Sequence, residues 1–281
     1  MAIMTGSSSC SDKWMLVPSP KTQPATRNFA TFTIFQHTAI HLHRVVVFWF
    51  IQKIPYLCVY LCLDEAGKQT KTKSMKVLII NGSPRKEGNT ATALAEVARQ
   101  LAKEGIESEI VWIGNKPIRG CAACGQCAAK GLGRCVFDDD ICNRISEKFA
   151  DANALIVGSP VYYGQPNGAL LSVIQRAFYS NGASISGKPA ASIAVCRRGG
   201  ATAAFESLNM PFQMMNMPVV TSQYWNIVYG RTPGESAMDR EGMQTMQTLA
   251  RNMAWLLKST KGEKAPGRPT DEPWDAMHFI R

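Results

Sequence analysis

The feature that most constrains this chain is a regular alternation, from Met75 onwards, between short apolar runs and longer amphipathic segments. Val77 to Ile80 is a continuous apolar run, and the turn sequence Asn-Gly-Ser-Pro follows it at once. This pattern is typical of a strand that is buried on both faces of a parallel sheet. The next segment, Thr90 to Glu104, repeats its apolar residues at three- and four-residue steps, which predicts an amphipathic helix that ends at Gly105.

The same alternation continues to the end of this region. Further strands are predicted at Glu109–Ile113, Ala154–Gly158, Ala190–Cys196 and Val219–Val228, and further helices near Asp140–Ala150, Gly168–Tyr179, Thr202–Met215 and Ser236–Lys258. Five strands that are each followed by a helix predict an α/β fold, a doubly wound parallel sheet with helices on both faces. Ligands bind such sheets outside the carboxyl ends of the strands, so the loops after the first four strands are candidate sites.

The chain is expected to have three parts. Residues 1–74 are predicted to be an unstructured extension outside the catalytic domain, residues 75–260 to form that domain, and residues 261–281 to be a C-terminal tail. The apolar run from Val45 to Leu63 is the one candidate membrane segment, and Gln52, Lys53 and Pro55 interrupt it, so its insertion is evenly balanced. A natural translation start at Met75, a membrane anchor and a transit peptide all stay open.

The charge distribution indicates the type of ligand, and the cysteine content indicates the cellular compartment. The net charge of +10 divides equally between residues 1–74 and 75–281, and the basic residues are scattered, so nucleic-acid binding is set aside in favour of a small anionic ligand. Nine cysteines occur in a chain with long apolar segments, which favours a reducing, cytoplasmic location over a secreted disulfide scaffold. Histidines stand only before Met75 and at His278, so no catalytic triad is expected.

The loop after the first strand reads Gly-Ser-Pro-Arg-Lys-Glu-Gly-Asn-Thr and runs directly into a helix. The free N–H groups and partial positive charge of a helix N-terminus suit a phosphate group. The spacing does not match a nucleotide-triphosphate loop, and no dinucleotide fingerprint is present. The alternative is an ordinary turn in which Asn89 or Thr90 caps the helix.

Two later loops have compositions that suit a flat ring with a polar rim. The third strand is followed by Gly-Ser-Pro-Val-Tyr-Tyr-Gly-Gln-Pro, which sets two tyrosines between turn residues, although such pairs also simply pack. The fourth strand is followed by Cys196-Arg-Arg-Gly-Gly-Ala, whose guanidinium groups suit an anionic ring or a dinucleotide phosphate.

Taken together, the run KVLIINGSPRKEGNT, the run GSPVYYGQ, the later SQYWN and the stretch from Asp239 to Leu257 resemble the NAD(P)H-dependent FMN reductases of the flavodoxin-like superfamily. The resemblance covers residues 75 to about 260 and implies a sheet of strand order 2-1-3-4-5. It implies that the FMN phosphate is held by Ser83, Arg85, Gly88, Asn89 and Thr90. It also implies that the ring is lined by Pro160, Val161, Tyr162, Tyr163 and Gly164, with Cys196, Arg197, Arg198, Gly199 and Gly200 on its other edge.

The loop after the second strand carries the motif Cys121-x2-Cys124-x2-Cys127-x7-Cys135. This motif resembles that of the iron-sulfur flavoproteins, a branch of the same superfamily, which implies a candidate [4Fe-4S] cluster. Free thiols and a structural zinc site stay open as alternatives.

The sequence therefore predicts an enzyme that passes electrons from NAD(P)H, its co-substrate, through FMN to a small-molecule acceptor or a redox partner protein. Its chemistry would take place at the flavin N5, without a catalytic side chain. The alternative function is an iron-sulfur flavoprotein that transfers electrons without nicotinamide. The expected assembly is a homodimer or a homotetramer, with no membrane association of the catalytic domain.

Overall fold

The computed structural model describes residues 74–267, which form one sheet with helices on both of its faces. The predicted extension up to residue 73, its apolar run included, and the end of the C-terminal tail lie outside the described residues. Between residues 74 and 267, no helix is both long enough and apolar enough to cross a bilayer.

The sheet has the predicted doubly wound arrangement. Its strands are β1 (Lys76–Asn81), β2 (Glu107–Trp112), β3 (Ala154–Tyr162), β4 (Gln165–Pro166), β5 (Ala190–Cys196) and β6 (Ile227–Tyr229). Five of them pair in parallel in the order β2-β1-β3-β5-β6, while the two-residue β4 pairs antiparallel with β3. This confirms the fold class and the predicted order 2-1-3-4-5 once β4, which was not predicted, is set aside.

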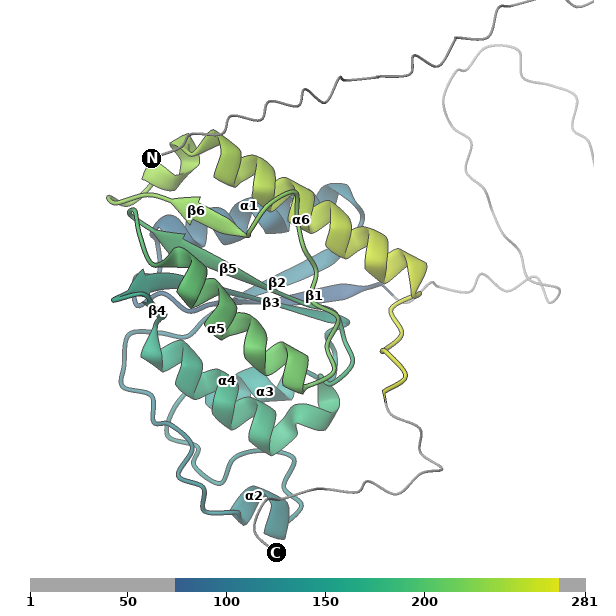
Figure 1. Cartoon of the computed structure of the whole chain (residues 1–281). Coiled ribbons are helices and arrows are strands. Elements are labelled where there is room, and N and C mark those ends of the chain that lie inside the picture. Colours follow the sequence, from purple (N-terminus) through teal and green to yellow (C-terminus); the bar gives the residue numbers. More distant parts are fainter. Residues whose placement is uncertain (1–73, 268–281) are drawn as a thin grey trace, which may run out of the picture. The chain divides into compact units, whose positions relative to one another are not determined.

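The helices lie in two layers. They are α1 (Asn89–Lys103), α2 (Gln126–Ala129), α3 (Cys142–Glu147), α4 (Gly168–Asn181), α5 (Ala201–Met214) and α6 (Arg240–Ser259), with 3-10 turns η1 (Gly182–Ser184) and η2 (Glu235–Met238). Helices α1 and α6 cover one face of the sheet and α3, α4 and α5 the other (Figure 1). The short α2 lies in the loop between β2 and α3, away from the sheet (Figure 1).

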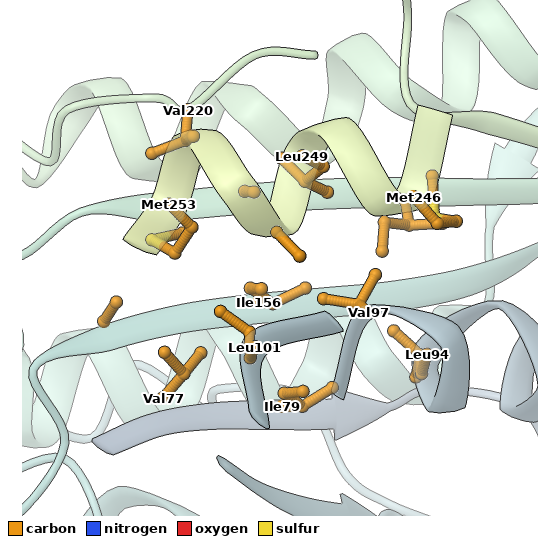
Figure 2. Packing of buried hydrophobic residues seen from close by; sticks show 14 of the residues in the cluster. Val77, Ile79, Leu94, Val97, Leu101, Ile156, Val220, Met246, Leu249 and Met253 are labelled. Atoms are coloured by element: carbon orange, nitrogen blue, oxygen red, sulfur yellow. The ribbon is translucent and has the colours of Figure 1, made fainter. Parts of the chain in front are cut away.

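Alternate side chains along β1 point to opposite faces of the sheet and so contribute to both core layers. Val77 and Ile79 point to the face covered by α1 and α6, and Leu78 and Ile80 point to the opposite face. Figure 2 shows the first layer, in which Val97 and Leu101 of α1 and Leu249 and Met253 of α6 meet the strand side chains. Each such buried side chain stabilises the fold by about 1.5–3 kcal/mol relative to its exposed state. This layer fixes α1, and therefore the loop before it, against the sheet.

The prediction of a strand at Val219–Val228 was wrong over most of its length. Val219 makes only an isolated bridge to Ala190, and the strand proper is confined to β6. Residues 221–225 are mostly exposed, and the Ser222 hydroxyl donates a hydrogen bond of 2.6 Å to the backbone oxygen of Tyr224. This local side-chain bond competes with pairing to β5. The backbone therefore leaves the sheet between the bridge at Val219 and the start of β6.

Two predicted helices are shorter than expected. The helix predicted at Ser236–Lys258 is divided into η2 and α6, because Asp239 lies outside the helical conformation and its carboxylate accepts a hydrogen bond of 2.9 Å from the Gly242 N–H. The helix predicted at Asp140–Ala150 is reduced to α3, since the Asp140 carboxylate accepts from the Cys142 N–H at 2.9 Å and so marks the helix start.

Candidate functional site

A cavity of about 210 Å³ opens at the carboxyl edge of the sheet. It is lined by the carboxyl ends of β3 and β5 and by the segments that follow β1, β5 and β6, the place where ligands bind doubly wound sheets. The predicted residues that line it are Ser83, Arg85, Gly88, Asn89, Thr90, Pro160, Val161, Tyr162, Cys196 and Arg197. Among the described lining residues none is acidic, whereas Arg85, Arg197 and Arg231 are cationic. The cavity is therefore suited to an anionic ligand.

The N-terminus of α1 forms one end of this cavity and has no side-chain cap. The N-cap residue is Gly88, whose φ of −159° is extended, and no side chain of residues 74–267 caps the first turn with a hydrogen bond. The first turn also has no acidic residue. The capping alternative for Asn89 and Thr90 is therefore wrong, since both residues lie inside the helix. An uncapped first turn leaves its N–H groups and partial positive charge available to an anion.

The loop between β1 and α1 is fixed by hydrogen bonds from three other segments of the fold. The Ser83 N–H donates to Oδ1 of Asn81 at 3.0 Å, and the Ser83 carbonyl accepts from Nε1 of Trp112 at 2.7 Å. Nδ2 of Asn167, which caps α4, donates to the Gly82 carbonyl at 2.6 Å. A Cβ atom at Gly82 would lie 2.5 Å from Leu170, so only glycine permits this approach to α4. The surrounding fold thus holds the loop in place through these contacts.

The loop after β3 is a tight hairpin that separates its two tyrosines. Tyr162 pairs with Gln165, and the two residues between them, Tyr163 and Gly164, both have positive φ angles of 52° and 77°. Such angles at both central residues are those of a type I′ turn. Tyr162 lines the cavity, while Tyr163 is fully exposed at the tip of the hairpin and does not line it.

In the loop after β5, only some of the predicted site residues line the cavity. Arg197 lines the cavity, but Arg198, Gly199 and Gly200 do not. Gly200 has a φ of 84°, and a Cβ atom there would lie 2.8 Å from the Cα atom of Gly164. These two glycines therefore hold the β3 and β5 loops together instead of lining the cavity. Burial raises the pKa of the Cys196 thiol, so this thiol faces the cavity in its neutral form.

Sequence reasoning missed the segment after β6. Gly230, Arg231 and Pro233 line the cavity together with Val195. The signal was the turn sequence Gly-Arg-Thr-Pro-Gly from residue 230, which directly follows a strand. This segment follows the fifth predicted strand, outside the four loops that the sheet pattern marks as candidate sites.

The four clustered cysteines line a second cavity, which lies over α4. Cys121, Cys124, Cys127 and Cys135 come from the β2–α3 connection, and Arg176 and Tyr179 of α4 complete the wall. In the described part of the chain, no group of three or more metal-binding side chains is arranged to hold a metal ion. Burial raises the pKa of the nearby Cys142 to about 12 and keeps it a thiol.

A comparison with protein families matches residues 75–232 to the NADPH-dependent FMN reductase family. The chain belongs to this family. The match includes every loop that lines the first cavity up to Thr232, and it identifies the chain as a flavoprotein oxidoreductase that uses FMN.

The curated relatives of this family member are iron-sulfur flavoproteins. One from Methanocaldococcus jannaschii is 32% identical over 195 residues, which cover 66% of this chain and all of the relative. Another from Archaeoglobus fulgidus is 31% identical over 206 residues, which cover 70% of this chain and 86% of the relative. The structure of RosB with bound 8-demethyl-8-formylriboflavin-5'-phosphate aligns with a TM-score of 0.54 at 14% identity, covering 74% of this chain and 96% of that one. That likeness concerns the fold alone.

Proposed function

We propose that this FMN reductase family member accepts electrons from NADH or NADPH and passes them, through FMN bound in the first cavity, to a second acceptor. The observation that carries the proposal is that one cavity combines an uncapped helix N-terminus with an apolar and aromatic wall. A phosphorylated flavin has the same two parts, a dianionic end and a flat ring. When bound, FMN supplies hydride acceptance at N5 and electron transfer in one-electron or two-electron steps.

The phosphate end of the site is assigned to the first turn of α1 and the loop before it. The N–H groups of Asn89 and Thr90, the Ser83 hydroxyl and the Arg85 guanidinium would bind the phosphate oxygens. Ser83 and Thr90 are buried whereas Arg85 is exposed, so the hydroxyls would act in a desolvated setting and the arginine as an outer clamp. Gly88 would allow the phosphate to approach the backbone closely.

The ring end is assigned to the carboxyl ends of β3 and β5 and to the segment after β6. Pro160, Val161 and Tyr162 would contact one side of the ring, and Val195 and Cys196 another. The half-exposed Tyr162 marks the side from which a nicotinamide ring could reach the flavin. Arg85 already provides a cation for the FMN phosphate. The two further cations, Arg197 and Arg231, would therefore bind the phosphates of the nicotinamide nucleotide.

The second candidate function is electron transfer through FMN and an iron-sulfur cluster, without nicotinamide. Two observations favour it: the four clustered cysteines line one cavity, and the curated relatives are named iron-sulfur flavoproteins. The donor set has the chemistry of a cubane site, with three thiolates in seven residues and a fourth after a short loop. Binding would require the thiols to close around the cluster, because the described residues do not stand as a ligand set.

One experiment separates these functions. The full chain is purified anaerobically, its flavin is identified after release, its iron is assayed, and NADH or NADPH is then added while the flavin absorbance is followed. Bleaching of the flavin band supports the reductase. Iron near four atoms per chain with no response to either nucleotide supports the electron carrier. A colourless chain that cannot be loaded with FMN would refute both.

A further inference from the structure

Helix α4 carries a buried arginine that does not contribute to the FMN cavity. Arg176 is 1% exposed and forms an ion pair with the carboxylate of Asp140, which is also buried. Its Nη1 atom donates to the carbonyl of Arg119 at 3.2 Å, and its Nη2 atom donates to the carbonyl of Phe137 at 3.0 Å. Arg119 lies just before the first clustered cysteine, and Phe137 lies just after the last. One guanidinium group therefore holds both ends of the cysteine loop, defined here as residues 119–137.

Helix α3 holds the last cysteine of this loop from the other side. Oδ1 of the buried Asn143 accepts from the Cys135 N–H at 2.9 Å, and its Nδ2 donates to the Cys135 carbonyl at 3.0 Å. The backbone on both sides of this thiol is thus bound to one amide group. The position of Cys135 is set by the packing of α3 on α4 and not by the loop itself.

The guanidinium also faces the thiols. Arg176 lines the same cavity as the four clustered cysteines. Burial lowers the pKa of its guanidinium, but the hydrogen bond to the Asp140 carboxylate raises it, so the group stays charged. Within the described residues its Nε–H has no hydrogen-bond partner. The Asp140 carboxylate compensates the charge of Arg176, but a buried donor without an acceptor is costly, and an apolar residue of similar size would serve packing alone as well. Four thiolates around one divalent metal ion carry a net charge of about −2 and would place acceptors beside this donor.

We propose that Arg176 is the positioning residue of the thiol cavity, pinning both ends of the cysteine loop and compensating the negative charge of its thiolates when they bind a metal centre. This inference rests on the iron-sulfur form of the proposed function. It predicts that the removal of Arg176 weakens metal binding although Arg176 is not a ligand. Loss of a partner that orients metal ligands typically reduces metal affinity by roughly 10–100-fold.

The test uses Co²⁺ alone as the probe, added anaerobically to the reduced, FMN-loaded full chain. Thiolate-to-Co²⁺ charge-transfer absorbance reports thiolate ligation, and Cys124→Ser gives the background from other sites. The main variant combines Arg176→Met with Asp140→Asn, because removing both charges leaves neither buried ion unpaired. Arg134→Met is the matched control: Arg134 lies in the same loop, but it is exposed and pairs with the surface carboxylates of Asp138 and Glu147.

We expect the paired variant to bind Co²⁺ roughly 10–100-fold more weakly, with a weaker charge-transfer band, while Arg134→Met and FMN affinity stay within about twofold of the wild type. Arg176→Lys keeps a cation beside Asp140 but cannot reach both carbonyls. Its Co²⁺ affinity should therefore fall between that of the wild type and that of the paired variant. It also provides the decisive comparison if the paired variant does not fold. Wild-type affinity and spectrum in Arg176→Lys, or in a folded paired variant, would overturn the inference. A wild-type chain with no Co²⁺ signal above Cys124→Ser would overturn the cluster site as well, but not the FMN site.

Discussion

The backbone N–H of Ser236 donates a hydrogen bond of 3.1 Å to Oδ1 of Asn89, a residue 147 positions earlier in the chain. The Ser236 hydroxyl donates a second bond, of 3.2 Å, to the Asn89 carbonyl. A Cβ atom at Gly230 would lie 2.8 Å from the Asn89 side chain, so the segment after β6 packs directly on the start of α1. This relationship joins the phosphate end of the cavity to the segment that carries Arg231.

Asn89→Ala should destabilise the protein and weaken FMN binding together. The buried Ser236 N–H loses its acceptor, which costs about 1–2 kcal/mol, and the segment of Gly230 to Pro233 loses its anchor. We expect a matching decrease in the free energy of unfolding in urea and roughly tenfold weaker FMN binding. Ser236→Ala keeps the N–H donor and should cost less than half as much. Equal effects of the two substitutions would contradict this account.

Arg85→Ala combined with Thr90→Ala should discriminate FMN from riboflavin, which lacks the phosphate. Hydrogen bonds to a charged group contribute about 1.5–3 kcal/mol each, so FMN affinity should fall by roughly 3–5 kcal/mol, with imperfect additivity for neighbours. Riboflavin affinity should hardly change. Lys86→Ala is the control, because Lys86 is an exposed cation of the same loop that does not line the cavity. Titration of both flavins decides the matter, and parallel losses for the two would remove the phosphate assignment.

Gly200→Ala should loosen the loop that carries Arg197. The backbone at Gly200 is left-handed, a conformation that alanine disfavours, and the new methyl group would lie 2.8 Å from the Gly164 Cα atom. Together these features cause a strain of about 1–3 kcal/mol. We expect lower stability in urea and weaker FMN binding. Gly199→Ala is a matched control, since no atom of the described residues lies within 4 Å of its added Cβ atom and its φ is not positive. The explanation fails if both alanine variants behave alike.

Cys142 should make the protein less stable at alkaline pH. Its pKa is raised to about 12 by burial, from 9.0, so the unfolded chain releases this proton at lower pH than the folded chain does. The contribution of the thiol to stability is therefore full below pH 9.0 and is lost as the pH rises towards 12, with a slope of at most about 1.4 kcal/mol per pH unit. Cys142→Ala should reduce the alkaline slope of the unfolding free energy in urea. An identical slope in the two proteins would rule this out.

A chain that begins at Met75 should fold and bind FMN with the affinity of the full chain. All strands of the described residues and every described lining residue of the first cavity lie after this position. Met75 itself packs against the core and its carbonyl accepts a hydrogen bond from the Glu107 N–H. Circular dichroism and FMN titration of both chains provide the measurement. A shortened chain that is insoluble or colourless, beside a yellow full chain, would show that residues 1–74 take part in the fold.

The sequence by itself determined the order of strands and helices and the edge of the sheet where the ligand loops meet. The apolar period along β1 and α1 reports which side chains leave water, and that property is local. Glycine and proline punctuation located the loops that follow β1, β3 and β5 for the same reason.

Only the tertiary structure decided which loop residues face the cavity. Tyr162 and Tyr163 are equivalent in the sequence, but the type I′ turn sends one to the cavity and the other to solvent. The segment after β6 enters the site through Asn89, and Arg176 reaches the cysteine loop from α4 across 57 and 39 positions of the chain. These contacts depend on how the helices pack on the sheet, and no local pattern of residues encodes a bond between segments so far apart in the chain.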